Sequence, residues 1–162
     1  MFGVVTGAAV VLAACLLGWL VRPSPSHIPG AVSVRQYLDV KACLLTGSGG
    51  VSDGSAAAAW AGLRDASLAT KAMVSYQPVI GPATGSAALP YLASLAQRQC
   101  RVIVAVDTGP VAAAVSDAAR FGQIRFLVIA ARRSSANVTA IPPAPAAQLR
   151  TAVRAAVIAA AQ

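Results

Sequence analysis

The first 21 residues form an apolar run without one charged side chain, and this run constrains the chain more than any other feature. An α-helix rises about 1.5 Å per residue, so a helix over Met1–Val21 would span roughly 30 Å, the hydrocarbon thickness of a bilayer. Arg22 then opens a segment rich in proline and serine. The pattern predicts a transmembrane anchor or signal-like segment over residues 1–21, a linker over 22–38 and a globular domain over 39–162.

The attachment to the membrane can take three forms. We expect an intact transmembrane helix rather than a cleaved signal, because no lysine or arginine precedes the run and the run exceeds a typical signal core. Leu12-Ala-Ala-Cys15 also has the form of a bacterial lipobox, which makes Cys15 a candidate lipidation site. The residues after Cys15 stay apolar up to Val21, which favours the transmembrane helix over the lipoprotein.

Charge alone leaves the orientation in the membrane open. Arg22, Arg35 and Lys41 follow the apolar run, whereas only the α-amino group precedes it. The positive-inside rule then places the domain in the cytoplasm, although three charges spread over about 20 residues bias the orientation weakly.

Composition argues against catalysis. The one histidine, His27, falls in the predicted linker, so the domain lacks a histidine-containing triad or metal cluster. The Gly47–Gly50 turn lacks the Gly-Lys-Ser/Thr continuation of a phosphate-binding loop. We therefore expect a domain that is not an enzyme and binds no metal or cofactor.

The formal net charge of +8 permits contact with nucleic acid or anionic lipid. The arginines are scattered along the chain, however, and the aromatic residues do not interleave with them. We therefore expect a solvated basic surface and no nucleic-acid partner.

Hydrophobic periodicity predicts strands that alternate with helices. Short apolar runs indicate buried strands, and apolar residues spaced i, i+3, i+4, i+7 indicate helices. Pro78 marks the second strand as an edge strand, Pro90 is expected in the first turn of the second helix, and Ser52 or Asp53 is expected to cap the first helix. The predicted strands cover 40–46, 73–80, 101–106, 124–129 and 137–141, and the predicted helices cover 55–71, 88–96, 111–121 and 146–160.

Alternating strands and helices require a parallel sheet that is covered on both faces. Right-handed crossovers make the simplest solution a doubly wound α/β fold with strand order 2-1-3-4-5. Ligands of such sheets bind at the carboxyl ends of the strands where the order reverses, here between strands one and three. The loops at that point, 47–55 and 107–110, supply most of the candidate ligand-binding residues. These candidates are Thr46, Ser48, Asp53, Ser55, Asp107 and Thr108. Asp53 can equally be a helix cap, and Asp107 a turn residue.

Five segments carry a resemblance to a known family: 41–46, 60–63, 101–106, 111–129 and 137–139. They resemble the basic membrane protein family, the substrate-binding lipoproteins of ABC importers, some of which bind purine nucleosides. Their order and spacing match the first of the two lobes of that family. The resemblance implies a single lobe of a type 1 periplasmic-binding-protein-like fold, with an ABC permease as a partner.

The chain departs from this family at the ligand site. The family enters its first helix through an Asp-x-Ser-Phe-Asn segment, and counting back from Trp60 and Gly62 puts Ser52, Ser55 and Ala56 at the Asp, Phe and Asn positions. The stacking ring, the amide and the second lobe are therefore missing. We expect an accessory or degenerate binding domain, linked to uptake or sensing, with weak affinity for a small molecule such as a nucleoside.

Two cysteines bear on the compartment. Cys43 lies in the first predicted strand and Cys100 immediately before the third, and the order 2-1-3 makes these strands neighbours. The two residues can form a disulfide or stay as buried thiols, depending on their depth along the sheet. A disulfide would indicate an oxidising compartment. Together with the resemblance, this favours a single-pass protein of the cell membrane whose domain is extracytoplasmic.

Two other functions stay open at this level. An interaction or scaffold module would dock a membrane partner through the switch-point face and bind no small molecule. A cytoplasmic-facing domain would use its basic charge on anionic lipid or nucleic acid.

Overall fold

A computed structural model describes residues 38–161, apart from residues 53, 131–133 and 135. All five strands are parallel and form one sheet in the order β2-β1-β3-β4-β5, so the predicted doubly wound fold and strand order are confirmed. The strands are β1 (Leu38–Thr46), β2 (Ala72–Pro78), β3 (Cys100–Ala105), β4 (Arg125–Ile129) and β5 (Val138–Ile141). The sheet ends at β2, as Pro78 predicted.

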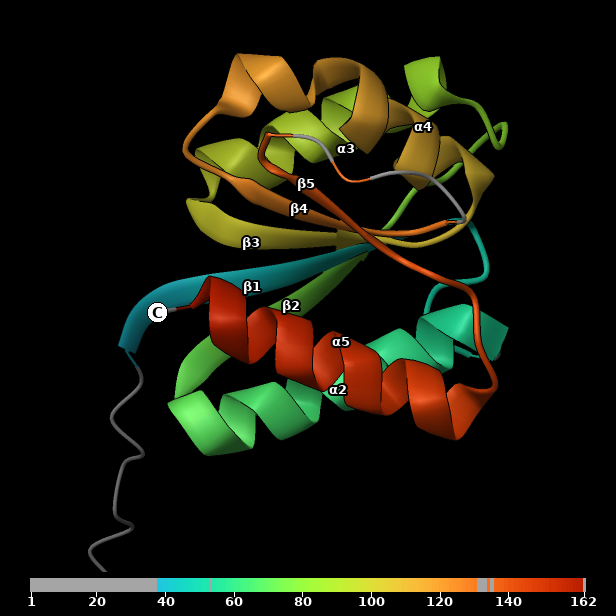
Figure 1. Cartoon of the computed structure of the whole chain (residues 1–162). Coiled ribbons are helices and arrows are strands. Elements are labelled where there is room, and N and C mark those ends of the chain that lie inside the picture. The colour runs from blue at the N-terminus through green and yellow to red at the C-terminus, as the bar shows by residue number, and fades with distance from the viewer. Residues whose placement is uncertain (1–37, 53, 131–133, 135, 162) are drawn as a thin grey trace, which may run out of the picture. The chain divides into compact units, whose positions relative to one another are not determined.

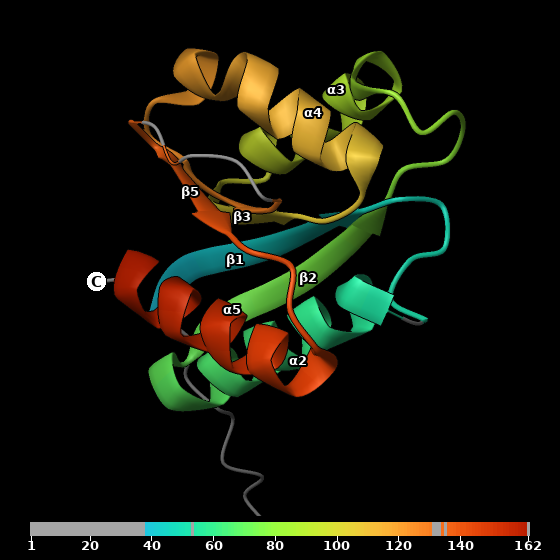
Figure 2. The ribbon, with the colours of Figure 1, turned by 45° about the vertical axis from the view of Figure 1, so that its right-hand side comes forward.

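Helices cover both faces of the sheet. The helices are α2 (Gly54–Thr70), α3 (Gly85–Gln97), α4 (Thr108–Asp117) and α5 (Ala146–Ala160), and a short 3₁₀ helix, η1 (Ala118–Phe121), follows α4. One face carries α2 and α5, and the opposite face carries α3 and α4 (Figure 1). The view turned by 45° shows the same two layers with the sheet between them (Figure 2).

Each face of the sheet has its own hydrophobic core. Side chains alternate between the two faces along a strand. Val102 and Val104 of β3 therefore pack under α2 and α5, whereas Ile103 and Ala105 pack under α3 and α4. This alternation explains why the strand sequence is apolar throughout, as expected for a sheet buried on both sides.

The close contact between α2 and α5 depends on a glycine. A Cβ atom on Gly62 would lie 2.6 Å from the carbonyl oxygen of Arg150, so a larger residue would push the helices apart. On the outside of this contact, Asp65 of α2 accepts two hydrogen bonds from the Arg150 guanidinium, at 2.6 Å from Nε and 2.8 Å from Nη2.

One local prediction was wrong, and one of the two predicted caps of α2 is excluded, while Asp53 lies outside the described residues. The α3 helix begins at Gly85, so Pro90 lies inside the helix and not in its first turn. The helix starts early because the Thr84 hydroxyl accepts a hydrogen bond from the Ala87 N–H at 3.3 Å, a cap that the weak apolar pattern there concealed. Ser52 does not cap α2, since its hydroxyl donates to the Gly49 carbonyl at 3.0 Å.

None of the helices between residues 38 and 161 has the length and apolar character needed to cross a membrane. The predicted anchor, its Cys15 and the linker as far as residue 37 lie outside the described residues. The domain itself forms a compact unit of its own.

Candidate binding site at the carboxyl edge of the sheet

The loops that follow β1 and β3 meet at the carboxyl edge of the sheet, as predicted. The Gly47 N–H donates a hydrogen bond of 2.8 Å to Oδ2 of Asp107. One step earlier, the Val106 N–H donates to the Leu45 carbonyl at 3.0 Å and extends the ladder between the two strands. The crevice between β1 and β3, where the order of the strands reverses, is therefore bridged by the protein itself.

Asp107 makes this bridge in an unusual backbone conformation. Its φ angle is 74°, in the left-handed region, where a non-glycine residue costs roughly 1–3 kcal/mol. It occupies the N-cap position of α4, yet its side chain does not cap that helix. The absence of a side chain at Gly47 makes room for this carboxylate, because a Cβ atom on Gly47 would lie 3.0 Å from Oδ2 of Asp107. Asp107 is thus a turn residue, which was one of the two roles expected from the sequence, and its side chain also joins the loops that follow β1 and β3.

A hollow of about 360 Å³ lies beside this bridge. It is bounded by the first turns of α2 and α4, by the ends of β3 and β4 and by Pro143 after β5, so it is displaced from the β1–β3 crevice toward the β5 side of the sheet. The Gly47–Asp107 bond bridges the crevice itself. The described lining residues are Ser55, Val106, Asp107, Thr108, Val111, Ala112, Ile129, Ala130 and Pro143.

The structure separates the predicted site residues into three groups. Ser55, Asp107 and Thr108 come together in the hollow. Thr46 does not line it, since this residue is fully buried and its hydroxyl donates to the Gly47 carbonyl at 3.1 Å. Ser48 is exposed in the turn that the Gly50 N–H closes on the Gly47 carbonyl, away from the hollow. Asp53 lies outside the described residues.

The sequence reasoning missed the apolar part of the lining. Ile129 ends β4 and Pro143 follows β5, and both come from strands beyond the predicted switch point. A signal for them existed, because all parallel strands end at one edge of the sheet. The described lining has one charged side chain and no aromatic ring or side-chain amide. Such a hollow can offer two hydroxyls and a carboxylate to a small polar molecule, but it cannot stack on a base.

Cys43 and Cys100 form a disulfide, with their Cα atoms 5.9 Å apart. Both residues are buried in the core under α3 and α4. The ladder between β1 and β3 shifts register between Lys41 and Ala42, and this irregularity lets two residues at different depths of the sheet meet. Among residues 38–161, within the described ranges, no group of histidine, cysteine and acidic side chains could hold a metal ion.

Comparison with known proteins supports the fold and identifies no family. No protein-family model matches the chain, and no curated protein matches it. In fold, the chain is similar to the crystal structure of a fragment described as a "putative lipoprotein" from Peptoclostridium difficile 630. The TM-score is 0.59 at 15% sequence identity, over 74% of this chain and 96% of that chain. Fold and hollow together thus define a doubly wound α/β domain with a hollow at the carboxyl edge of its sheet.

Proposed function

We propose that this chain is a membrane-anchored, extracytoplasmic binding domain without catalytic activity. In this proposal it is a single-lobe relative of type 1 periplasmic binding proteins, accessory or degenerate, and linked to ABC-type uptake or sensing of a small molecule. The hollow beside the Gly47–Asp107 bridge carries the proposal, because doubly wound sheets bind their ligands at this edge.

Three observations support the proposed location. The Met1–Val21 run has the length and composition of a membrane anchor. The Cys43–Cys100 disulfide is typical of oxidising, extracytoplasmic compartments. The fold neighbour, at 15% sequence identity, is described as a "putative lipoprotein".

The lining of the hollow favours a hydroxyl-rich ligand held weakly. The hydroxyls of Ser55 and Thr108 and the carboxylate of Asp107 can exchange hydrogen bonds with a sugar such as the ribose of a nucleoside. Without an aromatic ring in the described lining, stacking on a base, commonly about 1–3 kcal/mol, is missing. We therefore expect an affinity weaker than micromolar for one copy of the domain.

Thermal unfolding with purine nucleosides tests the proposed site. A ligand that binds only the native state must raise the melting temperature in a saturable way. We expect such a rise at millimolar nucleoside, its loss in Thr108→Val, and no change in the matched control Ser48→Ala, whose hydroxyl lies outside the hollow. Micromolar binding would contradict the degenerate site, and the absence of any rise would contradict nucleoside binding.

Fractionation and protease access test the location. Full-length protein should stay in the membrane through high-salt and carbonate washes, and Cys15→Ala should leave it there. Protease added to intact spheroplasts should digest the domain and spare a cytoplasmic marker. Release by Cys15→Ala would instead identify a lipoprotein, and protection from protease would place the domain inside the cell.

One observation favours an interaction module as a second candidate. Tyr76 of the edge strand β2 and Ile80 just beyond it are exposed, and Trp60 of α2 packs edge-on against Tyr76 with ring centroids 5.4 Å apart. An edge strand beside exposed apolar side chains is suited to pairing with another protein. If this candidate is right, Tyr76→Ser weakens cross-linking to a membrane partner in intact cells, and nucleosides leave the melting temperature unchanged.

A further inference from the structure

Basic side chains stand at the starts of four neighbouring strands. Lys71 directly precedes β2, Lys41 lies near the start of β1, Arg101 is the second residue of β3, and Arg125 is the first residue of β4. The Nζ atom of Lys41 also donates to the carbonyl oxygen of Arg98 at 3.4 Å, which brings Arg98 to the same place. We call these five residues the basic edge.

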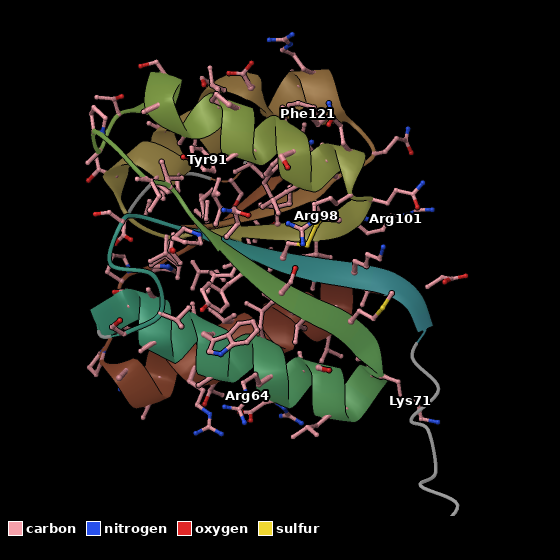
Figure 3. All side chains as sticks on the ribbon, turned by 180° about the vertical axis from the view of Figure 1, so that it is seen from behind. Arg64, Lys71, Tyr91, Arg98, Arg101 and Phe121 are labelled. Carbon is pink, nitrogen blue, oxygen red and sulfur yellow. A yellow bond between two sulfur atoms is a disulfide. The ribbon has the colours of Figure 1, made fainter. Side chains whose placement is uncertain are left out.

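The register of the sheet makes the basic edge a row. Lys41 is level with the first residue of β3, and Arg125 is level with Val102, one step beyond Arg101. Neighbouring strands lie about 4.8 Å apart, so the four strands span roughly 15 Å. Figure 3 shows Arg101 and Lys71 on the side of the domain where β1 begins, and Arg98 beside the disulfide.

The charges of the basic edge are not neutralised by neighbours. Within the described part of the chain, none of its five residues forms an ion pair, whereas Arg120 pairs with Asp117 and Arg150 pairs with Asp65. Two described acids lie near this edge. Asp39 is the second residue of β1, and Asp117 is already paired with Arg120. The edge therefore keeps a positive excess.

Local structure accounts for only part of this row. Helices end at the amino edge of the sheet, and cations there stabilise the carbonyl groups of the last turn. Lys71 follows the end of α2, and Arg98 is the C-cap of α3, so both can serve that purpose. Arg101 and Arg125 stand on strands, and no helix end explains their charges.

The surface at this edge is also hollowed. One hollow of about 340 Å³ is lined by Lys41 and Arg98, and another of about 500 Å³ is lined by Lys41, Arg101 and Asp39. Both are wide enough to admit a phosphate-sized head group beside a cation. The basic edge thus offers depth as well as charge.

We propose that the basic edge binds the anionic lipid surface of the membrane in which the chain is anchored. The inference rests on the anchoring proposed above. The chain enters the domain at the start of β1, which is this edge, and residues 22–37 can span at most about 55 Å. The tether therefore joins the domain at this edge and is long enough for the edge to reach the head groups. The described linings of the two hollows contain no aromatic residue, which disfavours single-stranded nucleic acid as the occupant.

Vesicle binding by the domain without its tether tests the proposal. Both cores and the disulfide lie within the compact unit of residues 35–162, so this unit can be studied alone. It should sediment with vesicles containing about a quarter phosphatidylglycerol and not with phosphatidylcholine alone, since each basic residue near an anionic surface contributes about fivefold. Arg101→Gln/Arg125→Gln should weaken the partitioning about 25-fold.

Arg64→Gln/Arg154→Gln is the matched control. It removes the same charge, but Arg64 and Arg154 lie near Asp65 on the outer face of α2 and α5. We expect a loss of no more than about twofold for this variant, and release of the unmodified domain as salt rises from about 0.05 to 0.5 M. Circular dichroism and the melting temperature verify that both variants fold.

Three results would overturn the proposal. These are equal binding to neutral and anionic vesicles, equal losses in the two variants, and tighter binding to duplex nucleic acid than to vesicles with the same dependence on Arg101 and Arg125. Such a failure is distinguishable from a failure of the proposed function, because nucleoside-induced stabilisation and the membrane fractionation of the full chain do not involve these two arginines.

Discussion

The two edges of the sheet differ in chemistry and in how they are held. In the described loops of the carboxyl edge, Asp107 is the one charged side chain, and its hydrogen bond from Gly47 joins the loops that follow β1 and β3. Near the amino edge stand the five cations of the basic edge, the Cys43–Cys100 disulfide and an amide clamp made by Asn137. In its described part, the carboxyl edge carries one acidic side chain and no disulfide, whereas the amino edge carries five cations and is linked by the disulfide.

A parallel sheet makes such a division possible. Every strand starts at one edge and ends at the other, so residues at strand starts and residues in the following loops never mix. Short loops that can adjust suit the binding of a small molecule at the carboxyl edge. A fixed array of cations suits the binding of a charged surface at the amino edge. The fold thus separates a candidate ligand site from a candidate membrane surface within one small domain.

The largest predicted effect is the loss of the covalent bond near the amino edge. Cys43→Ala/Cys100→Ala opens a link across 57 residues and should lower the free energy of unfolding by about 2–4 kcal/mol in denaturant titrations. Reduction of the unmodified protein is the control and should produce a similar loss. Thiols that react with an alkylating reagent before reduction would contradict this expectation and remove the support for an oxidising compartment.

The next effect concerns the amide clamp. Nδ2 of Asn137 donates to the carbonyls of Ala118, Phe121 and Ile124, at 2.9, 3.1 and 2.9 Å, and ties the turn before β4 to the start of β5. Asn137→Ala removes the donor from these carbonyls, of which Phe121 keeps the bond from the Ile124 N–H, and should cost about 2–3 kcal/mol. Gln123→Ala, an exposed neighbour at the same edge, should change the unfolding free energy by no more than about 0.5 kcal/mol. Equal effects of the two substitutions would show that the clamp contributes nothing.

The sequence predicts the sheet better than it predicts either edge. Strand order and the helix over 146–160 follow from periodicity, because burial on both faces of a parallel sheet leaves a strong apolar pattern. The hollow lies beside Asp107, whose positive φ angle leaves no trace in the hydrophobic periodicity. The basic edge consists of residues 41, 71, 98, 101 and 125, which look scattered along the chain and form a row only through the parallel register. The prediction of a diffuse basic surface therefore missed this row.

A smaller effect is expected at the carboxyl edge. Asp107→Ala removes the bond to Gly47 and keeps a side chain in the left-handed region, so it should cost about 1 kcal/mol. Asp107→Gly removes the same bond but relieves the backbone, so its stability should stay near that of the unmodified protein. Unfolding in urea measures both. If Asp107→Gly lowered the free energy of unfolding as much as Asp107→Ala, the backbone at residue 107 would be unstrained. The carboxyl edge would then hold no strained residue.

The smallest effect comes from the outer face of α2 and α5, where Asp65 pairs with Arg150, whereas the cations of the basic edge form no ion pair among the described residues. The hydrogen bonds from Arg150 hold the pKa of Asp65 below its ordinary value, and the charges of Arg154 and Arg64 act in the same direction. A carboxyl whose folded pKa is lowered contributes stability above its unfolded pKa, and this contribution is lost as the pH falls through the folded pKa. Arg150→Gln should therefore raise the pKa of Asp65, followed by NMR of its carboxyl carbon, and make the loss of stability in acid shallower. Arg154→Gln removes a charge but no hydrogen bond and should move the pKa less. An Asp65 titration that is the same in all three proteins would mean that the pair is open in solution, and that the cations of this face are as free as those of the basic edge.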